Sequence, residues 1–298
     1  MKFHGLITGN SYQDDQLNIE VRAEEKQSLA LVEGDRIELE FSPSRECIGY
    51  RSSEKEGSSL LECPEAVVGI TSSQCENCLG RANILPCLRC TGDVCRNAAK
   101  RDFCIQPDNH ALYLASFASG VIKVGVSRWE RRTQRLLEQG AKTAIIVAQN
   151  DGQMIRRYEA LITKFGYIDR LTSSEKLGYL SRSASTEELL VELHQALDTI
   201  RLRMNATWIE PEVIELPDYP SIPGLEFSKL WKPNKKGDSA SILKAEIVNI
   251  TGRLLILKDL DANNQQPIAV DVKDLVGYRV QPASEDSYTS GQMQLSLF

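Results

Sequence analysis

The stretch that decides the fold of this chain is ALYLASFASGVIKVGVS, which occupies residues 111–127. Two apolar runs, residues 111–117 and 121–127, flank the small tripeptide Ala118-Ser119-Gly120. Short apolar runs joined by small turn residues are typical of a β-hairpin. We therefore expect two antiparallel strands here.

The residues that follow the hairpin predict a helix, a strand and a second helix. Residues 128–139 suit a helix that stops at Gly140, and residues 143–148 form a third apolar run. The second helix carries an apolar stripe at the spacing of one helix face, made of Met154, Ile155, Tyr158, Leu161, Ile162 and Phe165. Gly166 ends this stripe, and an amphipathic helix over residues 187–203 follows a capping Ser185 or Thr186. The middle of the chain thus predicts the order β-β-α-β-α and one further helix.

All eight cysteines precede the hairpin, and their spacing predicts zinc binding. They are Cys47, Cys63, Cys75, Cys78, Cys87, Cys90, Cys95 and Cys104. In each of two neighbouring Cys-x-x-Cys pairs, both thiolates can reach one tetrahedral ion at about 2.3 Å per bond. The two pairs together suit a four-cysteine site, and eight thiolates suffice for one or two structural zinc ions. The spacing leaves open which cysteine serves which ion. His110 is an alternative ligand, and redox or catalytic thiols are the alternative function.

The flanking segments complete an α+β chain in which we expect six regions. Alternating apolar residues, such as Leu17, Ile19 and Val21, indicate strands near the N-terminus, and similar runs recur after residue 241. The regions are a β module (1–46), a Cys-rich zinc-binding segment (47–108), the β-β-α-β-α core with its further helix (109–204), a proline-rich connector (205–240), a small β module (241–281) and a flexible tail (282–298). Whether the two β modules pair is left open.

Composition and charge restrict the classes of function. The 298 residues are 42% apolar and 26% charged, with a formal net charge of -6. This is ordinary globular composition, and the acidic balance argues against a general coat for nucleic acid. No apolar run approaches the roughly 20 residues that span a bilayer, and the first ten residues do not suit a signal peptide. We therefore expect a cytoplasmic protein with no membrane partner and with reduced cysteines.

Residues 89–142 depart from the acidic average, with ten basic and five acidic side chains. A local basic face can contact phosphates without making the whole protein bind nucleic acid indiscriminately. The candidates for such contacts are Arg128, Arg131, Arg132 and Lys142. The alternative interpretation is a solvated helix face.

The β-β-α-β-α segment resembles the core of the GIY-YIG endonucleases. The similarity lies in Ala111-Leu112-Tyr113, in Lys123-Val124-Gly125, in Arg135 on the first helix and in Glu159 on the second. This chain has Ala-Leu-Tyr in place of Gly-Ile-Tyr and a lysine in place of the second tyrosine, and Arg132 is a second candidate for the arginine.

The resemblance implies Mg²⁺- or Mn²⁺-dependent phosphodiester hydrolysis. Glu159 would hold the metal, Arg135 would bind the developing charge on phosphate, and Tyr113 or Lys123 would help take a proton from water. The order of the Cys-rich segment, His-Ala-Leu-Tyr, Lys-Val-Gly and Leu-Leu-Glu-Gln-Gly-Ala also resembles an uncharacterised family, a domain of unknown function, which supplies no known activity.

Residues 294–298, Gln-Leu-Ser-Leu-Phe, resemble the pentapeptide with which bacterial proteins bind the DNA polymerase sliding clamp. Leu295, Leu297 and Phe298 would fill an apolar pocket, and Gln294 would form a hydrogen bond at its rim. The polar residues before the motif would act as a tether. The alternative is an edge strand or a terminus packed on its own domain.

These features lead to one functional hypothesis and two rivals. The hypothesis is a zinc-containing, Mg²⁺-dependent nuclease that acts on branched or single-stranded DNA in replication or repair and is recruited by the sliding clamp. The first rival is a catalytically inactive nucleic-acid-binding adaptor with the same tail. The second is a protein that binds or processes RNA through its zinc segment.

Overall fold

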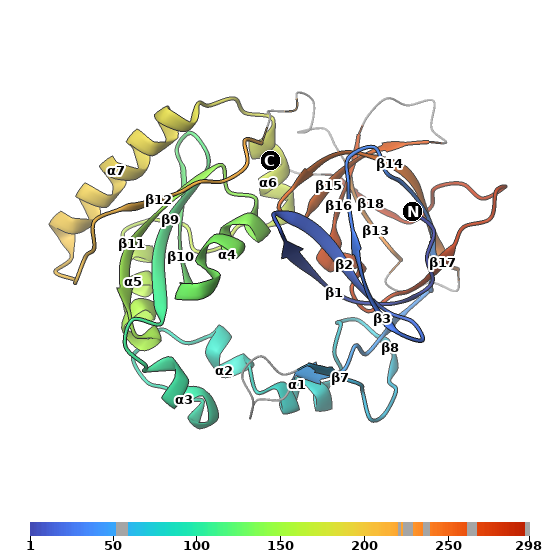
Figure 1. The fold of residues 1–298 in the computed structure, drawn as a ribbon, viewed down its shortest axis with the longest axis horizontal. Helices are drawn as coiled ribbons and strands as arrows, with labels where there is room; N and C mark the ends of the chain where they lie inside the picture. Colours follow the sequence, from blue (N-terminus) through green and yellow to red (C-terminus); the bar gives the residue numbers. More distant parts are fainter. Residues whose placement is uncertain (52–58, 220–221, 223–228, 235–238, 261–266, 296–298) are drawn as a thin grey trace. The chain divides into compact units, whose positions relative to one another are not determined.

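The computed structural model describes the chain except for residues 52–58, 220–221, 223–228, 235–238, 261–266 and 296–298 (Figure 1). The chain forms two compact units. The terminal unit combines residues 1–83 with residues 227–298, and the central unit spans residues 84–226. The central unit is therefore inserted in the sequence between two halves of the terminal unit.

The terminal unit is built on one ten-stranded sheet. Its strands are β1 (Gly5–Gln13), β2 (Gln16–Arg22), β3 (Lys26–Ala30), β4 (Arg36–Phe41), β13 (Lys229–Lys232), β14 (Ser241–Thr251), β15 (Leu254–Asp259), β16 (Ile268–Asp271), β17 (Arg279–Pro282) and β18 (Gln292–Leu295). Their order across the sheet is β18-β13-β16-β15-β14-β4-β17-β1-β2-β3, and the 3-10 helix η3 (Val272–Leu275) follows β16.

The two terminal β segments, expected as separate modules, form this sheet together. Strand β4 pairs with β14 on one side and with β17 on the other, and β17 also pairs with β1. The buried residues Ile37, Leu39 and Phe41 alternate along β4. An unpaired strand edge leaves backbone N–H and C=O groups without partners. Two short sheets that pair edge to edge therefore satisfy these groups. The two expected β modules are thus parts of one sheet.

The central unit contains a four-stranded sheet and most of the helices. Its strands are β9 (His110–Ala118), β10 (Val121–Arg128), β11 (Thr143–Asn150) and β12 (Glu212–Ile214), in the order β10-β9-β11-β12. Its helices are α2 (Leu85–Leu88), α3 (Ala98–Cys104), η1 (Trp129–Arg131), α4 (Arg132–Gln139), α5 (Gly152–Thr163), α6 (Ser173–Leu180) and α7 (Thr186–Arg203). None of the helices in the described residues is long and apolar enough to cross a membrane.

The predicted order β-β-α-β-α is confirmed by β9, β10, α4, β11 and α5. Gly140 ends α4 with a φ of 67°, a left-handed conformation that suits glycine. Asp151 caps α5 by accepting a hydrogen bond from the Met154 N–H at 2.8 Å. Ser185 caps α7 and forms a capping box with Glu188. Local caps and periodicity therefore define these elements.

Two elements of the central unit differ from the expectation. Helix α6 lies in a segment for which we expected no helix, and β12 lies in the proline-rich connector. Strand β12 pairs with β11 from Ile146↔Glu212 to Ala144↔Ile214. Part of the connector is therefore a strand of the sheet, because it satisfies the open edge of β11.

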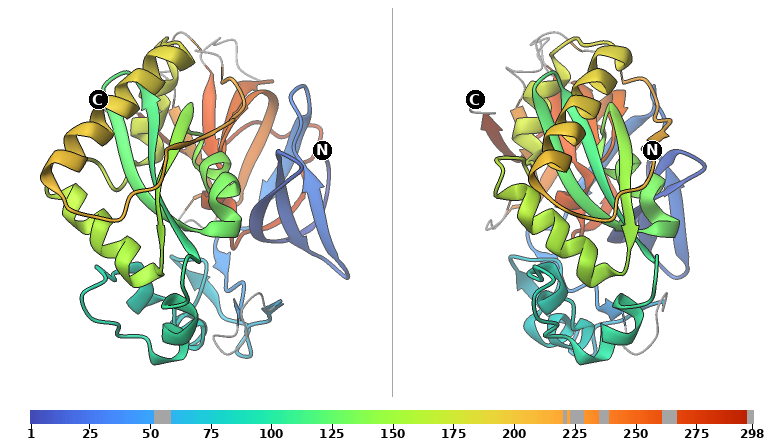
Figure 2. Two further views of the ribbon diagram at one scale, coloured as in Figure 1. Left: turned by 60° about the vertical axis from the view of Figure 1, so that its left-hand side comes forward. Right: turned by 90° about the vertical axis from the view of Figure 1, so that its left-hand side faces the viewer.

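Both faces of the central sheet are covered, and β9 is buried along its whole length. Leu112 and Leu114 pack on the face that carries α5 and α7 (Figure 2). Tyr113 and Ala115 point to the opposite face, where they pack with Leu136 of α4. The alternation of β9 thus sends the motif tyrosine to the α4 side of the sheet.

Candidate metal centre and active site

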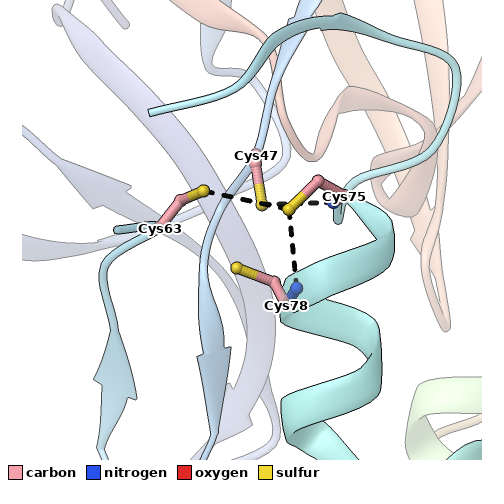
Figure 3. Close-up of side chains that lie close together, drawn as sticks. All are labelled: Cys47, Cys63, Cys75 and Cys78. Atoms are coloured by element: carbon pink, nitrogen blue, oxygen red, sulfur yellow. Dashed lines mark hydrogen bonds between the residues drawn. The ribbon is translucent and has the colours of Figure 1, made fainter. Parts of the chain in front are cut away.

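Four cysteines of the terminal unit converge on one point. The Sγ atoms of Cys47, Cys63, Cys75 and Cys78 all lie within 4.8 Å of one another. Figure 3 shows Cys47 and Cys63 approaching from two extended segments and Cys75 and Cys78 from the start of one helix. Cys63 Sγ lies 3.9 Å from Cys75 Sγ, close to the spacing of thiolates around one tetrahedral ion. These four residues could hold a zinc ion, as the sequence predicts.

Short ladders bring Cys47 and Cys63 to this point. Cys47 directly follows β5 (Arg45–Glu46), which pairs with β8 (Val68–Ile70). Cys63 lies just after β7 (Leu60–Leu61), which pairs with β6 (Tyr50–Arg51).

A helix start supplies the other two thiols. Cys75 is the N-cap of α1 (Glu76–Ala82), and Cys78 lies in the first turn of that helix. The Cys78 N–H donates to Cys75 Sγ at 3.5 Å, and the Cys75 N–H donates to Cys47 Sγ at 3.2 Å. Backbone N–H groups at a helix start favour the thiolate, which is the form that binds metal.

Cys47, Cys63 and Cys78 differ in the direction of their pKa shifts. Burial raises the pKa of Cys47, and burial together with the neighbouring thiols raises that of Cys78. Burial also raises the pKa of Cys63, but hydrogen bonds from the backbone of Val67 and Glu65 outweigh it and bring that pKa to about 7. Because zinc must displace the remaining thiol protons, zinc affinity should increase with pH.

The other four cysteines lie in the central unit. The group of four thiols described above includes one of the two Cys-x-x-Cys pairs, Cys75 and Cys78. Cys87 lies in α2 and Cys104 ends α3, with Cys90 and Cys95 between these helices. Burial raises the pKa of Cys104, and the charges of Cys90, Cys95 and Cys87 raise it further. These four thiols are therefore neighbours, although no three of their sulfur atoms all lie within 4.8 Å of one another.

His110, the alternative ligand, is buried beside Cys104. Burial lowers the pKa of His110 to about 4, and the charge of Arg156 contributes. Its Nδ1 shares a hydrogen bond of 2.5 Å with the Asn109 side chain. The imidazole is therefore neutral at neutral pH.

Tyr113 is enclosed, with only 1% of its surface exposed. Its hydroxyl accepts a hydrogen bond from Gln139 Nε2 at 2.7 Å. Gly125 lies directly opposite Tyr113 on β10, and a Cβ at that position would overlap the tyrosine ring. The glycine of Lys-Val-Gly is thus required for close approach of the ring. The hydroxyl thus faces α4, the helix that carries Gln139.

Lys123 lies on top of that ring. Its Nζ is 5.7 Å from the centroid of Tyr113, and only 8% of the residue is exposed. The ammonium donates one long hydrogen bond of 3.4 Å to the Val124 carbonyl. A buried cation with so few partners among the described residues is suited to receive an anion.

Glu159 projects from α5 and is half-buried. Burial raises the pKa of its carboxyl, the charges of Lys123, Arg156 and Arg135 lower it, and Asp169 raises it. Among the described residues its carboxylate makes neither a hydrogen bond nor an ion pair. The structure therefore brings Glu159, Lys123 and Arg135 within electrostatic range of one another and leaves the carboxylate without a direct partner.

The two candidate arginines of α4 differ in their contacts. Arg132 donates to Glu212 at 2.9 Å and lies 4.1 Å from the centroid of the Trp129 ring. Arg135 makes one ion pair of 3.4 Å with Glu138, and 43% of its side chain is exposed, against 24% for Arg132. Arg135 is therefore the more exposed of the two arginines, whereas Arg132 attaches α4 to β12.

The other candidates for nucleic-acid contact already have partners. Arg128 lies 4.7 Å from the Phe103 ring centroid, and Lys142 donates to the Arg182 carbonyl at 2.7 Å. Burial lowers the pKa of both side chains. Arg131 pairs with Glu138 at 2.9 Å and is about half exposed.

The tail candidates divide between described and undescribed residues. Gln294 and Leu295 lie in β18, which pairs with β13 through Leu230↔Gln294 and Lys229↔Leu295. Leu297 and Phe298 lie outside the described residues. The first half of the motif thus forms an edge strand, which was the alternative interpretation.

Sequence reasoning missed Gln139 and Asp169. Gln139 is a polar residue on the buried side of α4, and that position was the available signal for it. Asp169 follows Ile168, whose carbonyl accepts from the Val124 N–H at 2.8 Å, so this segment runs beside β10. No local pattern in the sequence indicates that return.

Comparison with known proteins gives one family. Residues 34–280 match the model of a family described as a protein of unknown function, DUF2797. No curated protein and no solved structure matches the chain significantly.

Proposed function

The chain belongs to the DUF2797 family, and from the geometry of its central unit we propose that it is a metal-dependent nuclease acting on DNA. The observation that carries this proposal is the half-buried carboxylate of Glu159, which has no direct partner among the described residues. Lys123 and Arg135 are close enough for their charges to act on it. One free carboxylate beside two cations is a suitable arrangement for a divalent metal and a phosphate.

The residues fit such a metal in their chemistry. Mg²⁺ prefers oxygen ligands and is usually held by one or two carboxylates together with water and substrate phosphate. Glu159 offers the first carboxylate, and Asp169 is near enough to affect its pKa. When bound, the metal would polarise the phosphate and stabilise the leaving oxygen.

The side chains then divide the remaining tasks. Arg135 would bind a phosphate oxygen and stabilise the charge that develops there. Lys123 would contact the attacking water or the phosphate. Its ammonium group lies over the Tyr113 ring. The resemblance to GIY-YIG endonucleases supports this assignment, because the matching residues lie on the same order of strands and helices.

The zinc cluster has a different role in this proposal. Four cysteines leave no open coordination position, so a zinc ion at Cys47, Cys63, Cys75 and Cys78 would be structural. It would hold a segment of the terminal unit that has little apolar core.

Cleavage of labelled branched, flapped and single-stranded DNA tests the nuclease. In Mg²⁺ or Mn²⁺ the wild type should cleave, and Glu159→Gln should not, because the carboxylate is lost while size and hydrogen bonding are kept. The matched control is Glu187→Gln, which makes the same change at an exposed position of α7. Cleavage that survives Glu159→Gln would refute the assignment.

Binding without cleavage would favour the rival, a catalytically inactive nucleic-acid-binding adaptor. Preference for single-stranded RNA over branched DNA in a competition assay would favour the second rival, a protein that binds or processes RNA.

We further propose that residues 294–298 recruit the protein to the polymerase sliding clamp, on the strength of their sequence alone. Since β18 is an edge strand, its release from β13 would cost few contacts. Removing residues 294–298 should abolish binding to the clamp and leave cleavage of free DNA unchanged. Equal binding by the truncated chain would exclude this motif.

A further inference from the structure

Residues 84–108 form two short helices without an apolar core. Neither α2 nor α3 buries any side chain, and the large apolar residues Leu85, Leu88 and Val94 are exposed. Within this range only Gly92 and Asn97 are buried. Ordering each residue costs backbone conformational entropy, so a segment of this length needs a source of stability other than apolar burial.

Thiols gather where that core would be. The side chain of Asn97, only 3% exposed, donates from Nδ2 to Cys87 Sγ at 3.2 Å. The Gly92 N–H donates to Cys90 Sγ at 3.4 Å, whereas the Cys95 thiol donates to the Asn97 carbonyl at 3.4 Å. Buried N–H donors directed at sulfur stabilise thiolates, as they do in the first cluster.

We propose that Cys87, Cys90, Cys95 and Cys104 bind a second zinc ion, separate from the one at Cys47, Cys63, Cys75 and Cys78. The first four already complete a tetrahedral set, so these four need their own ion. Zinc would replace four thiol protons and draw the sulfur atoms closer than they lie here.

This second site would fix the start of α5. Arg157 of α5 donates from Nε to the Gly92 carbonyl at 2.9 Å and from Nη2 to the Asp93 carbonyl at 3.4 Å. Cys104 Sγ lies so close to Gly152, the first residue of α5, that a Cβ there would be 2.8 Å away. Residues 84–108 are thus attached to α5, the helix that carries Glu159. Its influence on cleavage rests on the proposed function, but the presence of the ion does not.

Zinc content measured on the purified full chain tests the proposal. The wild type should contain two zinc ions per chain. The double variant Cys87→Ser and Cys90→Ser should retain one, and so should Cys63→Ser with Cys78→Ser, because each pair belongs to a different ion. One zinc per wild-type chain, lost only with the second pair of substitutions, would overturn the second site. Zinc counting is independent of cleavage, so an inactive protein with two ions would reject the nuclease and keep this site.

A second measurement avoids variants that fail to fold. N-ethylmaleimide alkylation of the native wild type, read by mass spectrometry, reports which thiols are protected. All eight cysteines should resist alkylation and become reactive when a chelator is added. Rapid alkylation of Cys87, Cys90, Cys95 and Cys104 before chelation would refute the site, and so would disulfides among them.

Discussion

The buried carboxylate of Glu159 destabilises the folded chain at neutral pH. Burial raises the pKa of its carboxyl, so the folded chain binds this proton more tightly than the unfolded chain. Stability from this group is therefore present at low pH and is lost as the pH rises through the folded-state pKa. We predict that Glu159→Gln raises the melting temperature at pH 7 and that the gain disappears below the ordinary pKa of 4.5.

The same two proteins report on metal binding. A ligand that binds only the folded state raises its stability, so Mg²⁺ should raise the melting temperature of the wild type and leave that of Glu159→Gln unchanged. Thermal melts at both pH values, with and without Mg²⁺, measure both effects. A variant less stable than wild type at pH 7 would mean that the carboxylate has a structural partner instead.

Arg135 and Arg132 form a matched pair on α4. Arg135→Ala should retain stability and lose cleavage, because that side chain is exposed and makes a single surface ion pair. Arg132→Ala should lose about 1–2 kcal/mol of stability, because it loses both the stacking on Trp129 and the ion pair with Glu212. Urea unfolding and cleavage assays separate these outcomes. The opposite pattern would assign the phosphate contact to Arg132.

How far the sequence could predict the site depends on the distance between partners. Alternation along β9 and β10 suffices to place Tyr113, Lys123 and Gly125 on one face, because the hairpin turn fixes their register. The hydrogen bond from Gln139 and the nearness of Asp169 depend on how α4 and the segment after α5 pack. Such packing has no local pattern, so the sequence could not show it.

At the scale of elements, the zinc segment of the terminal unit should unfold when its metal is removed. The described residues of this segment, 47–51 and 59–83, form short ladders and α1, whose start is set by Cys75 and Cys78. A structural zinc ion contributes about 10–16 kcal/mol in small metal-dependent domains. We predict that a chelator sharply raises hydrogen exchange in residues 59–83 and leaves β14 and β15 protected.

Acid should produce the same local unfolding, because protonated thiols release zinc. Exchange measured by mass spectrometry at falling pH checks this, with released zinc followed by a colorimetric indicator. Unchanged protection of α1 after complete chelation would show that the segment is stable without metal.

Among the helices, the sequence could predict those with a clear apolar period. Helices α5 and α7 have Asp151 and Ser185 as caps and apolar stripes behind them. Strand β12 has three residues among prolines, and it exists because β11 offers an open edge. Its formation is a property of its neighbour, which local propensity does not contain.

At the scale of the whole molecule, the ten-stranded sheet depends on residues that lie 240 to 275 positions apart in the sequence. Gly5 pairs with Val280, and Tyr12 donates through its hydroxyl to the Gly252 carbonyl at 2.5 Å. Each half of the terminal unit therefore supplies strands that the other half needs. Alternation predicted the strands, but nothing in either half indicates which distant edge it meets.

This interdependence predicts the effect of removing residues 227–298. Strand β4 would lose both neighbours, β14 and β17, and β1 would lose β17. The exposed apolar faces of Ile37, Leu39 and Phe41 would then favour unfolding of residues 1–83. The central unit keeps all four strands of its own sheet within residues 84–226.

Limited proteolysis with mass spectrometry should therefore show rapid cleavage in residues 1–83 of the truncated chain and continued resistance of residues 109–203. If residues 1–46 instead stayed protected, the N-terminal strands would be a self-sufficient module, and the shared sheet would not be what stabilises them.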